Sequence, residues 1–279
     1  MHTPVLLQET VNGLAVKKGG RYIDATAGAG GHLEALLKLG AHVLAIDWDE
    51  NQLIAVKRRI TNRSHLILVP GNFGQIETIA KKNRFDSVDG VIFDLGLSFN
   101  QLSDSGRGFS FKNDDDPLDM RINEKNELKA ADLLNSLTKD NLYEIFAKYG
   151  EEINSLSIAE TIVRTRTVKP YMKVRDLKES IDKTVKNNNN RIYARIFQAL
   201  RIGVNDELTH LKAGLAGALK ILSPKGRMVV ISFHSVEDRV VKKFGREQKL
   251  IQITKLLGRS RNRPSFEQSA VLRVFAKSV

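Results

Sequence analysis

The residue types with the clearest chemical potential stand near the start of the chain, in the segment Asp24-Ala25-Thr26-Ala27-Gly28-Ala29-Gly30-Gly31. Glycines allow the backbone to turn tightly and to approach a ligand closely. Asp47 lies 17 residues after Gly30, at the end of the next apolar run. A carboxylate at that point can accept hydrogen bonds from both hydroxyls of a ribose. The loop alone is compatible with a plain turn, but the two features together predict a site for a nucleoside cofactor.

The residues around the glycines favour one class of nucleoside cofactor over the others. A dinucleotide fingerprint that begins at Gly28 needs a third glycine where this chain has Leu33. The Lys-Ser/Thr pair of a phosphate-binding NTPase loop is also missing. An acid a few residues before the glycines, here Asp24, is typical of methyltransferases. The segment therefore favours S-adenosylmethionine over a dinucleotide.

A further acid, Asp94, ends a later apolar run and precedes Leu95-Gly96-Leu97-Ser98. Ligands of open α/β sheets bind at the carboxyl ends of strands, so we expect Asp94 to lie near Gly30 and Asp47. The exocyclic amine of a base is a poor nucleophile because its lone pair is delocalised into the ring. An acceptor that binds its N–H can localise the lone pair and align it with a methyl group. Asp94 is therefore the predicted catalytic residue, and a strand-end cap is the structural alternative.

Two weaker features remain. Asp114-Asp115-Asp116 with Asp119 could suggest a metal site, but adjacent carboxylates cannot all point inward, and a solvated acidic loop is favoured. We expect no metal, because the methyl group comes from the donor. His234 stands at the end of a late apolar run. A catalytic role on the substrate side and a purely structural role suit it equally well.

The elements that must position these residues alternate between short apolar runs and helical segments. Strands are predicted at residues 21–26, 43–47, 66–69 and 88–93, and helices at residues 32–40, 50–60 and 75–82. Strands that alternate with helices predict βαβ units and a parallel sheet. The pattern resumes near the end of the chain, with a helix at residues 206–222 and strands at residues 228–233 and 270–275.

The alternation is interrupted in the middle of the chain. Residues 95–117 are rich in Gly, Ser, Asn and Asp and predict a long loop, and residues 127–202 are helical with little strand signal. We therefore expect an α/β core made of residues 1–102 and 203–279. Residues 103–202 would form a helical insertion that recognises the substrate.

The composition and the net charge of the chain narrow the classes of function that it can have. The chain has 279 residues and no cysteine, which excludes disulfides, thiolate metal sites and a cysteine nucleophile. Its net charge is +12, and residues 239–279 hold 11 Lys and Arg against two acids, nine of those twelve charges. That concentration favours a phosphate-binding surface over general solubility. No apolar stretch of about 18 residues and no signal-peptide layout is present, so we expect a cytoplasmic protein with no membrane partner.

Several motifs spread along the chain are shared with one known family. They are His2-Thr3-Pro4-Val5-Leu6-Leu7, Asp24 to His32, Asp94 to Leu102, Arg107-Gly108-Phe109-Ser110-Phe111, Pro117-Leu118-Asp119-Met120-Arg121, Tyr149-Gly150-Glu151-Glu152, Phe197 to Ile202, Val204 to Leu208, and Ser232 to Arg239. In these motifs the chain resembles the bacterial 16S ribosomal RNA cytidine-N4 methyltransferase family. The glycine loop alone is generic, but the combination is specific.

The resemblance implies a Rossmann-like class I methyltransferase with a mostly parallel sheet and an inserted helical domain. It implies S-adenosylmethionine as the methyl donor and a cytidine of 16S rRNA, in the small ribosomal subunit, as the acceptor. The family's cofactor contacts fall on Gly30, Gly31, His32, Asp47, Phe73, Asp94 and Gln101. It also makes the substrate-side role of His234 an expectation.

Other functions stay open at this point. The chain could methylate a different acceptor, such as DNA or a protein amine. It could also be a non-catalytic RNA-binding or ribosome-assembly factor, although the set Asp24, Gly28, Gly30 and Asp47 argues against a decayed site. The sequence does not decide the oligomeric state, and a homodimer is one state that it allows.

Overall fold

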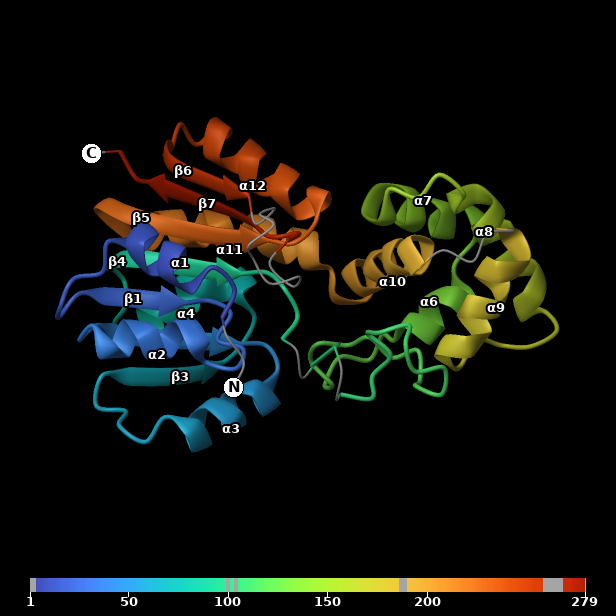
Figure 1. Ribbon diagram of the computed structural model, residues 1–279, viewed down its shortest axis with the longest axis horizontal. Coiled ribbons are helices and arrows are strands. Elements are labelled where there is room, and N and C mark those ends of the chain that lie inside the picture. Colours follow the sequence, from blue (N-terminus) through green and yellow to red (C-terminus); the bar gives the residue numbers. More distant parts are fainter. Residues whose placement is uncertain (1–3, 99–100, 103–104, 186–189, 258–267, 279) are drawn as a thin grey trace. The chain divides into compact units, whose positions relative to one another are not determined.

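The computed structural model describes residues 4–98, 101–102, 105–185, 190–257 and 268–278 (Figure 1). The chain divides into two compact units, one made of Met1–Leu97 and Leu208–Val279 and the other of Ser98–Glu207. The second unit is five residues longer at each end than the insertion predicted at 103–202. Residues 239–279, which hold most of the net positive charge, form the basic tail; its residues 258–267 lie outside the described residues.

The first unit is built on a seven-stranded sheet in the order β3-β2-β1-β4-β5-β7-β6. The strands are β1 Arg21–Asp24, β2 His42–Asp47, β3 Leu66–Pro70, β4 Val88–Asp94, β5 Leu222–Ser232, β6 Ile251–Leu257 and β7 Val271–Ala276. Strands β1 to β5 pair in parallel, and β7 is antiparallel to both of its neighbours. The prediction of an α/β fold with a mostly parallel sheet is confirmed.

Helices cover both faces of this sheet, as Figure 1 shows. They are α1 Leu7–Leu14, α2 Gly31–Lys38, α3 Glu50–Arg59, α4 Ile76–Lys82 after the short 3₁₀ helix η1 Phe73–Gln75, α11 Glu207–Ile221 and α12 Ser235–Glu247. Residues of α1, α2 and α3 pack on one face, and residues of α4, α11 and α12 pack on the other. The two cores lie on opposite sides of the strands.

Strand β2 shows why a continuous apolar run marks a buried strand. Successive side chains of a strand point to opposite faces. Val43 and Ala45 belong to one core, and Leu44 and Ile46 belong to the other. Since helices cover both faces, each of these positions must be apolar. The sequence VLAI of β2 therefore follows from its central place in the sheet.

Several elements were not predicted. Helices α1 and α12 and strand β6 were missed, although β6 carries the alternating pattern Ile251-Gln252-Ile253. It is an edge strand that pairs only with β7, and its isoleucines stay exposed, so its burial signal is weak. Residues Ser223 to Gly226, which follow the helix predicted at residues 206–222, belong to β5, whose register with β4 shifts between Val88 and Gly90.

The second unit is helical. It contains α6 Ala130–Ser136, α7 Lys139–Gly150, α8 Ser155–Arg166, α9 Val174–Thr184 and α10 Asn190–Asn205. Leu134, Phe146, Ile158, Leu177 and Ile196, one from each helix, are fully buried. Gly150 lets α7 approach α10, because a Cβ there would lie 2.8 Å from the carbonyl oxygen of Arg195. Each helix thus contributes one apolar face to a single core.

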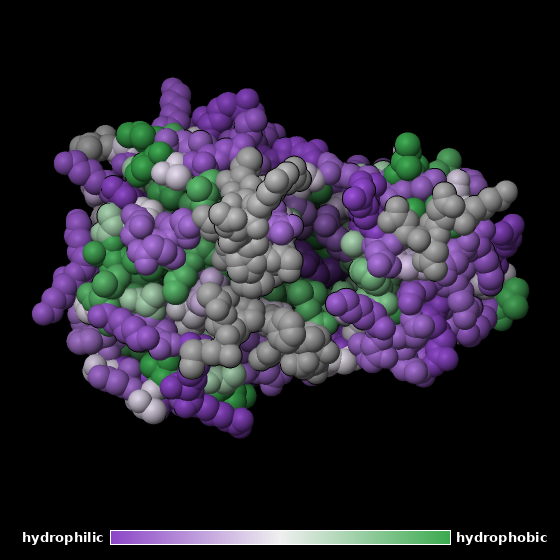
Figure 2. Space-filling view, in the orientation of Figure 1, coloured by the Kyte–Doolittle hydropathy of each residue, from purple (hydrophilic) through white to green (hydrophobic). Residues whose placement is uncertain are grey.

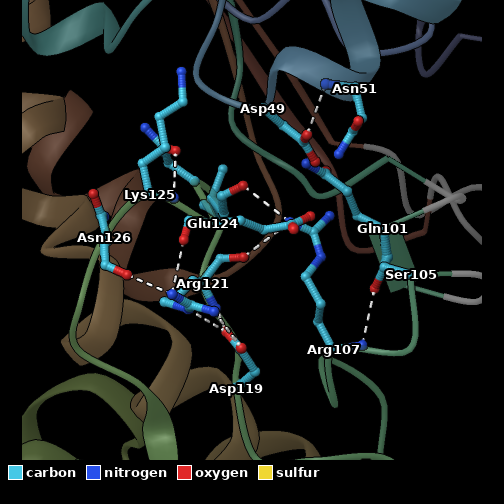
Figure 3. Close-up of polar contacts among 12 residues, drawn as sticks. Asp49, Asn51, Gln101, Ser105, Arg107, Asp119, Arg121, Glu124, Lys125 and Asn126 are labelled. Carbon is cyan, nitrogen blue, oxygen red and sulfur yellow. Dashed lines mark hydrogen bonds and ion pairs between the residues drawn. The ribbon is translucent and has the colours of Figure 1, made fainter.

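Hydrogen bonds made by two arginine side chains stabilise the segment before α6 (Figure 3). Arg121 forms two hydrogen bonds of 2.7 Å to the carboxylate of Asp119 and donates to the carbonyls of Glu124 and Asn126. Arg107 donates to the carbonyls of Arg121 and Ile122. These bonds satisfy backbone carbonyls in a segment that belongs to no helix or strand.

The acidic loop that could have suggested a metal site is ion-paired instead. Asp114 pairs with Lys178, and Asp115 pairs with Lys173 and Arg175, all at the start of α9. Within the described residues there is no group of three or more His, Cys, Asp or Glu side chains suited to a metal ion. The loop therefore serves the internal organisation of the helical unit.

The surface is mainly hydrophilic in the view of Figure 2, with hydrophobic residues scattered between charged ones. Among the helices described, none has the length and apolar character needed to cross a membrane.

Candidate functional site

Three carboxylates end three adjacent strands of the sheet. Asp24 ends β1, Asp47 ends β2 and Asp94 ends β4, and β1 lies between the other two strands. Because all three strands run in parallel, their carboxyl ends meet at the same edge of the sheet. This is the edge where open α/β sheets bind ligands. The structure therefore brings together the three acids that sequence analysis singled out.

The glycine loop follows β1 and leads into α2. Gly28 and Gly30 adopt left-handed conformations, with φ of 48° and 81°. Side chains other than glycine rarely adopt these values, so the loop requires glycine at both positions. Gly31 is needed for another reason: a Cβ there would lie 2.1 Å from the Cγ of Pro4.

Asp47 holds this loop in place. Its Oδ2 accepts the backbone N–H of Gly28 at 2.7 Å, and its Oδ1 accepts the N–H of Asp49 at 2.8 Å. Burial raises the pKa of Asp47 to about 7, although these two hydrogen bonds act to lower it. Each carboxylate oxygen can still accept a further bond. Two hydroxyl donors, such as those of a ribose, would stabilise the ionised form.

Hydrogen bonds hold the backbone around Asp94, and one oxygen of its side chain is left to accept a further bond. Its N–H donates to the hydroxyl of Thr26 in the glycine loop at 2.7 Å. The next residue, Leu95, donates its N–H to Ile231 of β5 at 3.0 Å. Oδ2 lies 3.5 Å from the Nε2 of His32, whereas Oδ1 is buried and has no hydrogen-bond partner among the described residues. Oδ1 is thus an acceptor that a ligand could use.

Phe73 belongs to the same unit, directly after β3. Its ring meets Phe93 of β4 edge-to-face, with centroids 5.7 Å apart. Gly214 of α11 allows this packing, because a Cβ there would lie 2.8 Å from the Phe73 ring. The preceding segment is tied to β2, since Gly71 donates its N–H to the carbonyl of Asp47 at 2.9 Å. This bond places the segment before Phe73 next to the acid that ends β2.

Sequence reasoning missed an aromatic pair at this edge. Trp48 directly follows Asp47, and its ring meets His210 of α11 edge-to-face at 5.1 Å. The Nδ1 of His210 also lies 3.1 Å from the Cβ position of Gly74. The signal available in the sequence was an aromatic residue next to a predicted ribose-binding acid. Nothing local could show that α11 would supply its partner.

The remaining predicted residues have different surroundings. His234 is the N-cap of α12: its Nδ1 accepts the N–H of Glu237, and its Nε2 lies 3.0 Å from the Glu237 carboxylate. This is a structural role, and its role toward substrate stays a prediction. Gln101 belongs to the helical unit, where its Oε1 accepts the N–H of Ser98 at 2.9 Å.

Some basic side chains of the tail are exposed to solvent, and others form contacts within the protein. Lys242, Lys243 and Arg246 of α12 are exposed. Arg273 is buried and pairs with Asp238 through two hydrogen bonds, and Lys277 donates to two backbone carbonyls. Arg259, Arg261 and Arg263 lie outside the described residues. Charge counted from the sequence therefore overstates what this segment can offer to phosphates.

The chain is similar to known proteins over most of its length. The sequence model of the MraW methylase family matches residues 1–270. The ribosomal RNA small subunit methyltransferase H of Carboxydothermus hydrogenoformans is 45% identical over 252 residues, which cover 88% of this chain and 81% of that protein. The protein of the same name from Thermomicrobium roseum is 45% identical over 254 residues, which cover 88% of this chain and 77% of that protein.

Proposed function

This chain belongs to the MraW methylase family, and we propose that it transfers a methyl group from S-adenosylmethionine to the N4 amine of a cytidine in 16S ribosomal RNA. The relatives are named as small-subunit ribosomal RNA methyltransferases, which supports the acceptor. The observation that carries the proposal is the row of Asp24, Asp47 and Asp94 on three adjacent strands, with the glycine loop tied to Asp47.

The residues present fit the cofactor. Gly28 and Gly30 form a cradle that a side chain would disturb, and Asp47 can accept ribose hydroxyls. Two buried carboxylate oxygens, Asp24 Oδ2 and Asp94 Oδ1, have no hydrogen-bond partner among the described residues. Gly30, Gly31, His32, Asp47, Phe73 and Asp94 would hold the cofactor from this unit, and the role of Gln101 in cofactor binding stays a prediction. Bound there, the cofactor supplies an electrophilic methyl group.

The chain's own task is to prepare the amine. Oδ1 of Asp94 would accept one N–H of the cytidine amine, localise the nitrogen lone pair and align it with the methyl group. The nitrogen would gain a bond to the methyl carbon while the bond between that carbon and the donor breaks and leaves its electron pair on the donor, and the nitrogen would become positively charged. It then loses a proton to the Asp94 carboxylate, from which the proton passes to water. The amine ends with one methyl group in place of one hydrogen.

The RNA would be held mainly through its phosphates. The exposed cations of α12 and the helical unit supply positive charge for this contact. A cytidine amine in RNA is reached most readily when its base is unstacked and turned out. Recognition by the helical unit, residues 98–207, and assembly as a homodimer are parts of the prediction that binding assays and light scattering would test.

The decisive experiment uses small ribosomal subunits that lack the modification. The chain is incubated with methyl-labelled S-adenosylmethionine, and naked 16S RNA, DNA and protein serve as parallel acceptors. Label on a single cytidine of the subunit supports the proposal. Cofactor binding without label in any acceptor would favour an RNA-binding assembly factor, and label in DNA or protein would identify another acceptor.

A variant pair tests the role of Asp94 itself. Asp94→Asn keeps the shape but removes the negative charge, and we expect turnover to fall by a factor on the order of 10² or more. Asp86→Asn, an exposed acid just before β4, is the matched control and should behave as the unaltered protein. Normal turnover by the Asp94 variant would contradict its assignment.

A further inference from the structure

The imidazole of His32 is enclosed between two carboxyl groups. His32 lies in the first turn of α2, and its side chain is only 7% exposed. Its Nε2 is 3.5 Å from the Oδ2 of Asp94, which is an ion-pair distance. Asp24, which ends β1 and is 1% exposed, also acts on His32 through its charge. Binding the cofactor through the backbone of the glycine loop requires none of this side-chain arrangement.

Hydrogen bonding within this group is incomplete. Both ring nitrogens of His32, Oδ2 of Asp24 and Oδ1 of Asp94 are buried and have no hydrogen-bond partner among the described residues. Buried polar atoms in folded proteins nearly always have a partner. Four such atoms on three neighbouring residues mark a site whose polar groups are arranged for charge and for a ligand rather than for stability.

The charges within the group favour a protonated imidazole. Burial acts against the charged ring, but the ion pair with Asp94 and the charge of Asp24 raise the pKa of His32 above its ordinary value. Burial raises the pKa of Asp24 to about 6, although His32 acts to lower it. One cation between two carboxylates is the arrangement in which each charge is compensated.

Among the residues that the structure describes, two carboxyl groups act on His32. The charged groups that act on it are Asp24 at the end of β1 and Asp94 at the end of β4. Glu34, also on α2, forms ion pairs with Lys38 and with Arg59 of α3 instead. The carboxylate of Asp47 accepts two backbone N–H groups. The two acids beside His32 thus determine its charge.

We propose that His32 is a positioning residue for methyl transfer: its imidazolium holds the Asp94 carboxylate in one orientation through Oδ2, which leaves Oδ1 for the amine. The inference rests on the proposed role of Asp94. His32 gives up no proton in the reaction, because the proton of the amine passes to Asp94 and then to water. Asp24 has the supporting task of keeping the imidazole protonated.

The task of Asp94 explains why a positioning residue is useful beside it. The carboxylate of Asp94 can present Oδ1 to the amine only while its side chain keeps one orientation. A cation 3.5 Å from Oδ2 attracts that oxygen and restricts rotation of the carboxylate without blocking Oδ1. Asp24, at the end of the adjacent strand, balances the charge of the imidazolium.

His32→Gln is the informative variant, because an amide can still donate a hydrogen bond but carries no charge. Single-turnover methyl transfer and cofactor affinity would be measured between about pH 5.5 and 9. We expect a loss of rate on the order of 10²-fold and cofactor affinity within about threefold of the unaltered protein. The fall in rate at high pH that follows loss of the His32 proton should be absent from the variant, since glutamine does not titrate. An unchanged rate and profile, or a change confined to affinity, would overturn the inference.

A spectroscopic readout tests the charge without the reaction. The ¹⁵N shifts of the His32 ring in the cofactor-free protein should show both nitrogens protonated at neutral pH, and Asp24→Asn should move this protonation to lower pH. A neutral His32 ring at neutral pH would contradict the inference.

Controls separate the inference from the proposed function. His42→Gln, at a half-buried residue that contacts His65 at the start of β2, should leave rate and profile unchanged. Thermal unfolding checks that each variant is folded. An inactive Asp94→Asn with a normal His32→Gln would overturn only the inference, whereas an active Asp94→Asn would overturn the proposed role of Asp94.

Discussion

The backbone N–H of Gly28 donates to Oδ2 of Asp47 at 2.7 Å, so the acid that ends β2 directly fixes the glycine loop that follows β1. Both residues belong to the predicted cofactor site. The bond means that the loop does not have to be ordered at the moment of binding, which lowers the entropic cost of that step. It also couples the protonation of Asp47 to the state of the loop.

Cofactor affinity should depend on pH through Asp47. Its pKa is raised to about 7, so the group is partly protonated at neutral pH, and only the ionised form can accept both ribose hydroxyls. We expect affinity to rise as the pH increases from about 6 to about 8 and then to level off. Titration calorimetry across this range is the measurement. Asp47→Asn should bind more weakly and lose the pH dependence, and a dependence that survives in this variant would assign it to another group.

Trp48 should report directly on cofactor binding. It is the chain's one tryptophan and is adjacent to Asp47, with its ring against His210. Intrinsic fluorescence should therefore change as S-adenosylmethionine is added, and it should saturate together with the calorimetric signal. Trp48→Ala should weaken binding by about 3- to 10-fold, as expected for roughly 1 kcal/mol of aromatic packing. A fluorescence signal that does not follow binding would place the base of the cofactor elsewhere.

Gly31 should tolerate no side chain. The Cβ of an alanine there would lie 2.1 Å from Pro4, whose ring cannot move aside without its backbone. We expect Gly31→Ala to lower the free energy of unfolding by about 1–3 kcal/mol and to weaken cofactor binding. Gly19→Ala is the matched control, since Gly19 has a φ of 75° but no atom within 4 Å of its Cβ position. It should cost only the backbone strain of about 1–2 kcal/mol and leave binding intact.

Asp119 should be important for the helical unit rather than for the chemistry. Despite burial, its hydrogen bonds and ion pair with Arg121 hold the pKa of Asp119 below its ordinary value. Asp119→Asn leaves the guanidinium without its charged partner, and we expect a loss of about 3 kcal/mol in the stability of this unit. Denaturant unfolding measures it. Glu144→Gln, which breaks an exposed pair with Lys148, should change stability by less than about 1 kcal/mol.

The contribution of Asp119 to stability should also depend on pH. A carboxyl whose pKa is lowered in the folded state stabilises the protein above its unfolded pKa and loses this contribution as the pH falls through the folded value. The Asp119→Asn variant should therefore differ most from the unaltered protein at neutral pH. The two should converge in acid, and a constant difference at all pH values would contradict this account.

The sequence by itself determined the strands, their terminal acids and the glycine loop. Apolar runs in buried parallel strands are continuous, so β1, β2 and β4 and the acids Asp24, Asp47 and Asp94 could be predicted locally. The family was also decided at this level, because its motifs are contiguous. The boundaries were predicted less accurately: the insertion was predicted at residues 103–202, whereas the helical unit spans Ser98–Glu207.

Only the tertiary structure decided which of these residues meet. The order β2-β1-β4 puts the ends of strands far apart in the chain side by side, and no local pattern encodes that order. It brings Asp94 against Thr26 and His32, and α11 brings His210 to Trp48. The edge strand β6 was missed because an exposed strand carries little burial signal. Periodicity shows which face of an element is buried, whereas the raised pKa of His32 follows from packing between distant segments.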